Sequence, residues 1–149
     1  MPANISPIFT RTPDIQVGAA ILGSAANTAT DGTGANSFLV FTADATEGGF
    51  VHKIILKPVS TIAATIVRVF VCTATGAFVA GVTNTALNSA MIAELPVAAF
   101  TASNTAASPQ YEIPLNMPLN ASFKIFLTFG ISTGAGTTGF GVTTVGGKY

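Results

Sequence analysis

The feature that most constrains the fold is a repeated alternation between short apolar runs and clusters of turn-forming residues. The runs are rich in Val, Ile, Thr and Phe, and clusters of Gly, Asn, Ser and Pro separate them. Such runs are typical of β-strands, and no segment keeps the period of an amphipathic helix. We expect eight strands, at about residues 15–22, 37–42, 50–57, 62–73, 92–100, 110–115, 122–131 and 138–145.

The number and spacing of these runs indicate the fold class. The chain has 149 residues, which suits one domain. Short strands at regular spacing predict an all-β antiparallel sandwich, with a jelly roll favoured and a small barrel as the alternative. We place the domain at residues 15–149 and interpret residues 1–14 as an extended arm, because Pro2, Pro7 and Pro13 oppose helix formation. The arm would lie across a neighbouring subunit or be a frayed terminus.

The chain carries very little charge. Charged residues make up 8% of it, against about 25% in an average domain, and six basic residues balance six acidic ones. This composition gives no footprint for binding nucleic acid or an anionic membrane. Because monomers normally stay soluble through surface charge, we favour a chain that hides part of its surface against partners over a neutral monomer.

One uncharged stretch, residues 69–93, reads VFVCTATGAFVAGVTNTALNSAMIA. Its Thr, Gly and Asn residues make it too polar for a membrane helix, which needs about 20 mostly apolar residues. We expect it to leave one strand, form a long loop and enter the next strand, with much of its surface facing other protein. The N-terminus also lacks the basic and apolar regions of a secretory signal.

Alternation along the strands assigns side chains to faces. The expected core-facing residues are Phe50, Ile54, Leu56, Thr65, Val67, Val69, Val71, Tyr111, Ile113, Leu115, Phe123, Ile125, Leu127 and Phe129. The expected outward residues include Val51, Lys53, Ile55, Lys57, Ile66, Arg68, Phe70, Cys72, Lys124, Phe126 and Thr128. Large apolar groups on neighbouring strands would form an interface patch, unless the phase is misjudged and they belong to the core. The predicted interface residues are Ile66, Phe70 and Phe126, with Ile5, Ile8 and Phe9 on the arm.

The residues that could carry chemistry are few. His52 is interpreted as a structural histidine on the face of Phe50, and Cys72 as a packing residue with no adjacent base. Asp44 and Glu47 could assist a calcium ion, but their segment, residues 42–50, is better explained as a turn between strands. The glycine-rich residues 132–141 are expected to form a loop. We therefore predict no catalytic residue, no cofactor and no metal site, and no enzymatic activity.

Five segments carry a resemblance to a known group of proteins. They are LVFTADATEGGFVHKIILKP, ATIVRVFVCTATG, IAELPVAA, YEIPLNMPLNASFKIFLTFG and GVTTVGGKY, and they lie in this order within residues 37–149. The series resembles small β-rich structural proteins of tailed bacteriophages and prophages, and among them the capsid decoration, or cement, proteins. Its motifs are packing and turn patterns, so no binding residue is carried over from the family.

The resemblance implies a role in binding. Cement proteins are jelly-roll or sandwich domains that sit as trimers at capsid symmetry axes and bridge neighbouring subunits. It therefore implies a homotrimer on the virion capsid surface, with the major capsid protein as partner and neither nucleic acid nor membrane. The alternatives are a tail, baseplate or fibre component, and a carbohydrate-binding module for host attachment that would use Tyr111 or Tyr149.

Overall fold

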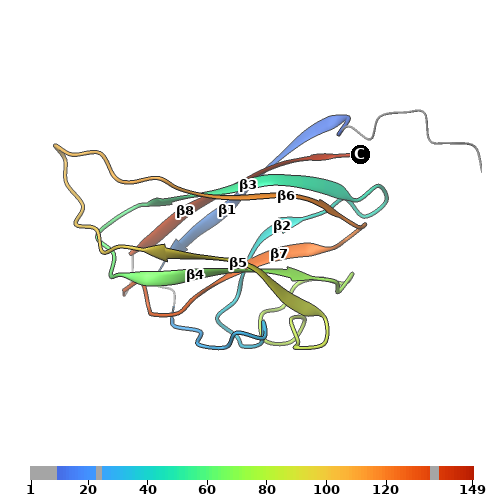
Figure 1. The fold of residues 1–149 in the computed structure, drawn as a ribbon, viewed down its shortest axis with the longest axis horizontal. Coiled ribbons are helices and arrows are strands. Elements are labelled where there is room, and N and C mark those ends of the chain that lie inside the picture. Colours follow the sequence, from blue (N-terminus) through green and yellow to red (C-terminus); the bar gives the residue numbers. More distant parts are fainter. Residues whose placement is uncertain (1–9, 23–24, 135–137) are drawn as a thin grey trace, which may run out of the picture.

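Two antiparallel sheets of four strands lie face to face in the computed structural model, which describes residues 10–22, 25–134 and 138–149 (Figure 1). The strands are β1 (Thr12–Leu22), β2 (Phe38–Thr42), β3 (Gly49–Pro58), β4 (Thr65–Cys72), β5 (Ser89–Val97), β6 (Tyr111–Leu119), β7 (Lys124–Phe129) and β8 (Gly139–Lys148). The expected all-β antiparallel sandwich is confirmed, and each expected run overlaps one strand. None of the described residues belongs to a helix that is long and apolar enough to cross a membrane.

Strand pairing joins the two halves of the chain. The first sheet has the order β1-β8-β3-β6 and the second has the order β2-β7-β4-β5. Within them β1 pairs with β8, β2 with β7, β3 with β6 and β4 with β5, so the chain folds back on itself at residues 73–88. Residues 69–93 therefore run from a strand through a long loop into the next strand, as expected.

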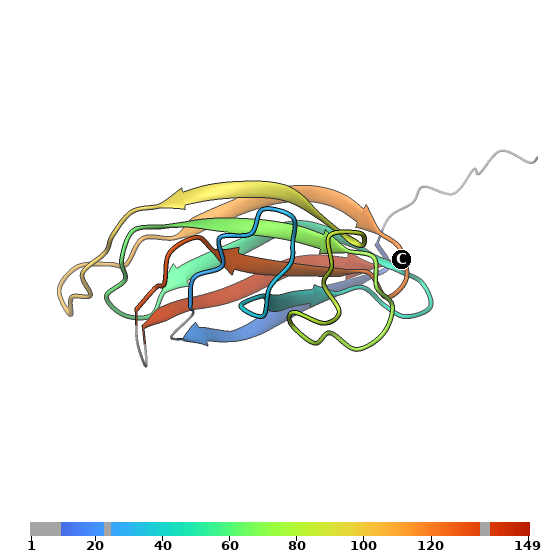
Figure 2. The ribbon, with the colours of Figure 1, turned by 90° about the horizontal axis from the view of Figure 1, so that it is seen from below.

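The sandwich has two ends, which position the surfaces described below. At the terminal end, β1 begins opposite the last residues of β8 (Figure 2). β4 also ends here, with Cys72 opposite Lys124 of β7. At the far end, β4 begins at Thr65, opposite Val97 at the end of β5. Residues 12–14, which we expected in the arm, belong to β1 and pair with β8. Residues 1–9 lie outside the described part of the chain.

The core lies between the sheets and is almost entirely aliphatic and phenylalanine. Ile54 and Leu56 of the first sheet and Val67 and Leu127 of the second are completely buried in it. Phe129 stacks on Phe140 of the opposite sheet with ring centroids 5.4 Å apart. The expected inward faces of β4 and β7 are therefore confirmed.

The phase of β3 changes within the strand. The register with both β6 and β8 shifts between Val51 and Lys53. Against β8, where Gly146 and Val145 are consecutive, His52 is the extra residue of a β-bulge, whereas against β6 the extra residue lies on β6 itself. The bulge turns Val51 into the core, where it is completely buried, and leaves His52 exposed. Our expectations that Val51 points outward and that His52 shares the inward face were therefore wrong, because simple alternation does not survive an inserted residue.

Candidate interaction surfaces

The outer face of the second sheet is divided into two halves, and the first is covered by its own chain. Phe70 of β4 and Phe126 of β7 stack at this position with ring centroids 5.0 Å apart, and Phe78 from the loop packs 5.4 Å from Phe126. Phe70, Phe126 and Cys72 are all completely buried. We call this region the covered half. The expectation that Phe70 and Phe126 lie on exposed surface is wrong, because residues 73–88 fold back over them.

Polar contacts to main-chain oxygens hold this cover in place. Lys124 is buried, and its Nζ donates to the carbonyl oxygens of Ala74, at 2.6 Å, and of Ser122, at 2.8 Å. Asn84, also buried, donates from Nδ2 to the carbonyl oxygen of Gly32 at 2.6 Å and to Oγ of Ser37 at 3.0 Å. These bonds join the loop to the segment before β2. Apolar side chains of the uncharged stretch thus face the protein's own sheet.

Gly32 allows the segment before β2 to approach this cover closely. Its φ is +83°, a value that favours glycine, and an added Cβ would meet Cβ of Ser89 at 2.6 Å and the ring of Phe70 at 3.2 Å. The cover therefore depends on a residue with no side chain at this position.

The second half of the same face, at the far end, is open. A hollow of about 430 Å³ lies there, and its lining consists of Ala64, Thr65, Ile66, Arg68, Pro96, Val97, Gly130 and Ile131. The side chains of Ile66 and Ile131 are 41% and 59% exposed. We call this region the open half, and Ile66 is where the sequence led us to expect an exposed apolar residue. Pro96 lies directly opposite Ile66 on β5, whereas Ile131 follows β7 and was not foreseen.

The open half has no unpaired charge. Arg68 donates from Nε to Oε1 of Glu94 at 2.8 Å and from Nη1 to the carbonyl oxygen of Asn27 at 3.2 Å. Its guanidinium is thus occupied by an acidic side chain and a main-chain oxygen. The remaining lining residues are uncharged, so the hollow suits an uncharged, apolar occupant.

The outer face of the first sheet is the second exposed apolar surface. Ile15 and Val17 of β1 are 60% and 76% exposed, and they lie opposite Val145 and Thr143 of β8. Ile55 of β3, next to Thr143, is half-buried and points outward as expected. We call Ile15, Val17, Ile55 and Val145 the outer apolar row.

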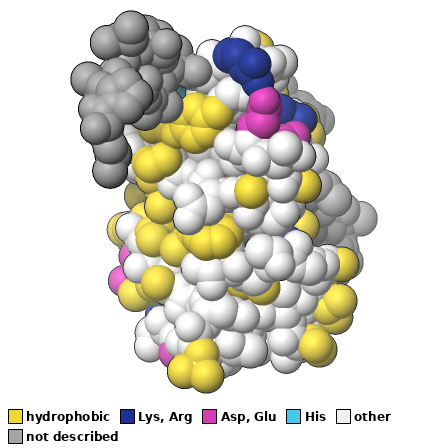
Figure 3. Space-filling view, turned by 90° about the vertical axis from the view of Figure 1, so that its right-hand side faces the viewer, with side chains coloured by type: hydrophobic (Ala, Val, Ile, Leu, Met, Phe, Trp, Pro, Cys, Tyr) yellow, Lys and Arg dark blue, Asp and Glu magenta, His cyan; other side chains and the backbone are white. Residues whose placement is uncertain are grey.

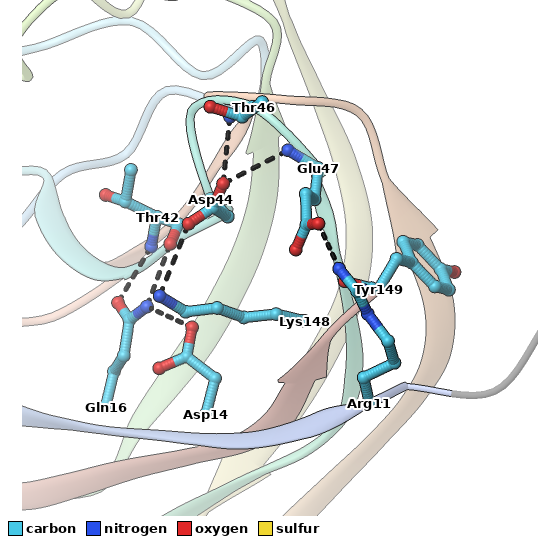
Figure 4. Close-up of polar contacts among 9 residues, drawn as sticks. All are labelled: Arg11, Asp14, Gln16, Thr42, Asp44, Thr46, Glu47, Lys148 and Tyr149. Atoms are coloured by element: carbon cyan, nitrogen blue, oxygen red, sulfur yellow. Dashed lines mark hydrogen bonds and ion pairs between the residues drawn. The ribbon is translucent and has the colours of Figure 1, made fainter.

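Charged side chains gather at the terminal end (Figure 4). Arg11 pairs with Glu47, and Nζ of Lys148 lies 3.3 Å from Oδ2 of Asp44. Oδ1 of Asp44 accepts the main-chain N–H groups of Thr46, at 2.9 Å, and Glu47, at 3.1 Å. These N–H groups, together with Lys148, hold the pKa of Asp44 below its usual value.

This arrangement accounts for Asp44 and Glu47 without a bound ion. Asp44 organises the turn between β2 and β3, as we expected, and basic side chains pair with both carboxylates. Among the described residues, no group of three His, Cys, Asp or Glu side chains could hold a metal. In the described part of the chain, four ion pairs take up eight of the twelve charged residues in the sequence.

The surface at the terminal end is otherwise neutral. Figure 3 shows hydrophobic side chains distributed over an uncharged surface, with the charged side chains in view gathered mainly in one area. Val82 and Leu87, on the outside of the loop that covers Phe126, are 73% and 100% exposed. The uncharged stretch therefore covers its own sheet on one side and leaves apolar groups exposed on the other.

The residues that the sequence offered as candidates for chemistry lie in different parts of the fold. His52 is exposed on the β3 bulge, and Cys72 is buried in the covered half with its Sγ 3.7 Å from Oδ1 of Asn88. The glycine-rich loop of residues 132–141 leads into β8, although residues 135–137 lie outside the described part. Tyr111 is half-buried and packs against the core.

A second hollow, of about 340 Å³, lies at the far end, between the β3–β4 connection and the loop after β5. Its lining includes Val59 and Phe100 as apolar residues, and Ser103, Asn104 and Ser108 as polar ones. No charged residue lines it.

Comparisons of the chain with protein-family models, curated proteins and solved structures found no match. The geometry of these surfaces is therefore the basis on which their binding partners can be inferred.

Proposed function

We propose that this chain is a structural protein of a tailed-bacteriophage or prophage virion, which decorates the capsid and stabilises it by bridging neighbouring capsid subunits. The observation that carries the proposal is the strand order, β1-β8-β3-β6 facing β2-β7-β4-β5. We assign this order to a jelly roll, an arrangement of eight strands in two sheets that is common in viral capsid domains and in lectins. The assignment agrees with the cement-protein resemblance of the sequence.

The surface chemistry supports adhesion. The outer apolar row presents Ile15 and Val17 on a face where Lys53, opposite Val145, already pairs with Glu112 at 2.9 Å. Lys57 of β3 is the exposed cation on the same face. Such a face would bind the major capsid protein by burying apolar surface in the contact. Stable protein–protein interfaces bury about 1,200–2,000 Å² in total. Weak contacts of this kind become effective when a homotrimer repeats them over symmetric sites. The proposed location is the capsid surface of the virion.

The direct test is quantitative mass spectrometry of purified virions, with this chain counted against the major capsid protein. We expect a ratio of about one to one or one to three, as for a protein that covers a symmetric shell. A ratio of a few per hundred would identify a tail, baseplate or fibre component. Absence from the particle would contradict the virion proposal altogether.

A pair of variants tests the outer apolar row. Val17→Asp places a charge in the proposed contact and should weaken capsid binding at least about tenfold, equivalent to about 1.4 kcal/mol. Its unfolding midpoint should stay close to that of the wild type, because Val17 is 76% exposed. Leu87→Asp, at a fully exposed position on the loop, is the matched control. Equal loss of capsid binding in both variants would contradict the assignment of this face.

The hollow beside Phe100 supports a second candidate function, binding of a neutral saccharide during host attachment. It combines the Phe100 ring with the hydroxyl and amide groups of Ser103, Asn104 and Ser108. A glycan array probed with wild type and Asn104→Ala would test it. Binding that the variant loses would support a saccharide site here, and an array without binding would remove this candidate. Tyr111, considered from the sequence, is not among the residues that line this hollow.

A further inference from the structure

We infer that the open half receives residues 5–9 of a second copy of this chain, so that copies join through an arm-in-hollow contact. The inference rests on the homo-oligomer in the proposed function but not on the capsid. Two observations carry it: the chemistry of the hollow, and its position at the opposite end of the sandwich from Thr10.

The hollow and the arm have matching chemistry. The hollow presents Ile66, Ile131 and Pro96, and its only charged residue, Arg68, is already paired with Glu94. Residues 1–10, MPANISPIFT, contain no charged side chain and carry Ile5, Ile8 and Phe9 around Pro7. An apolar segment with a proline enters such a site without burying an unpaired charge. Pro7 also reduces the conformational entropy that the arm loses on binding.

The arm of the same copy does not reach this hollow. Thr10 precedes β1 at the terminal end, whereas Ile66 lies near the far end of β4 (Figure 1). Ile5 is five residues from Thr10, a distance of at most about 18 Å. Ile66 is six residues from the terminal end of β4, about 20 Å, and the arm would also have to cross a sandwich whose sheets lie about 10 Å apart. The occupant is therefore the arm of a neighbour.

The resulting contact is head to tail. Each copy offers one arm at the terminal end and one hollow at the far end, so the same pair of surfaces repeats from copy to copy. A heterologous contact of this type closes into a ring if the rotation permits, and otherwise continues as a fibre. A ring of three copies would give the trimer of the proposed function.

A complementation experiment on the full chain tests the inference. Ile66→Asp damages the hollow and leaves the arm intact, whereas Phe9→Asp damages the arm and leaves the hollow intact. Sedimentation velocity should show an oligomer for the wild type and, for each variant alone, self-association weakened at least about tenfold. An equimolar mixture of the two variants should form a complex of two chains, since one intact arm meets one intact hollow.

Controls separate this contact from general damage. Val79→Asp, at an exposed loop position outside the hollow, should assemble like the wild type. If Ile66→Asp fails to fold, Ile131→Asp, at a 59% exposed position in the same hollow, replaces it. A monomeric wild type, or variants that stay monomeric when mixed, would overturn the inference. Assembly in solution by a chain that is absent from virions would overturn the proposed function and leave this contact standing.

Discussion

The covered half and the open half lie on the same face of the same sheet, yet their environments are opposite. Phe70 and Phe126 stack beneath Phe78 and are completely buried, whereas Ile66, on the same strand and the same face as Phe70, is 41% exposed. Alternation along β4 places both side chains outward. The difference comes from residues 73–88, whose Phe78 packs on Phe126, and from the segment at Gly32, which lies against the ring of Phe70. None of these residues lines the open half.

Outward apolar residues therefore have two different roles in this sheet. In the covered half, such residues form a small second core between the sheet and its own loop. In the open half, they line a hollow that nothing in the described chain fills. Lack of charge in the sequence therefore has an intramolecular cause at one position and, by our proposal, an intermolecular cause at the other.

The largest expected effect is the loss of stability in Phe126→Ala. Removal of a completely buried ring that stacks on Phe70 should cost about 3–5 kcal/mol of unfolding free energy. Urea denaturation followed by intrinsic tyrosine fluorescence or circular dichroism would measure it. A loss below about 1 kcal/mol would mean that this ring is not part of a core.

An intermediate effect is expected for Lys124→Ala. The substitution leaves the carbonyl oxygens of Ala74 and Ser122 without the donor they now share, which should cost about 1–3 kcal/mol. Hydrogen exchange within residues 73–88 should become faster than in wild type. Lys57→Ala, at an exposed position of β3, is the control and should leave this exchange unchanged. Unaltered protection in Lys124→Ala would contradict the anchoring role.

A small effect is expected for Ile66→Ala. Because Ile66 is partly exposed in an open hollow, its truncation should change the unfolding free energy of the monomer by less than about 0.5 kcal/mol. A loss of unfolding free energy as large as that in Phe126→Ala would contradict the difference in burial between the two halves. Denaturation at low protein concentration gives the monomer value.

The smallest effect is local and depends on pH. The pKa of Asp44 in the folded chain lies below its usual value of about 3.9, so its carboxylate adds stability above that pH and loses it as pH falls through the folded pKa. Hydrogen exchange of Thr46 and Glu47 should therefore accelerate below about pH 4, before the covered half opens. Asp44→Asn should abolish this pH step. A step of equal size in the variant would assign it to another group.

Much of the fold could be predicted from the sequence. Alternation and turn residues located all eight strands, the inward faces of β4 and β7, and the exposure of Ile66. The β3 bulge could not be predicted in this way, because the residue types of Val51, His52 and Lys53 do not indicate an inserted residue. The burial of Phe126 was also missed, since it depends on bonds from Lys124 and Asn84 to carbonyl oxygens of distant segments. Ile131 was missed because the sequence placed it at the end of the expected strand 122–131, whereas β7 ends at Phe129 and leaves Ile131 exposed beyond it.

The most direct test of the two halves is the rate at which a thiol reagent modifies each of them. Cys72, the only cysteine of the chain, is completely buried in the covered half. A second thiol, introduced by Ile66→Cys with Cys72→Ala, reports on the open half. The account predicts slow labelling of Cys72 at every protein concentration, and fast labelling of the introduced thiol that slows as copies associate. Fast labelling of Cys72 in the native wild type would contradict it.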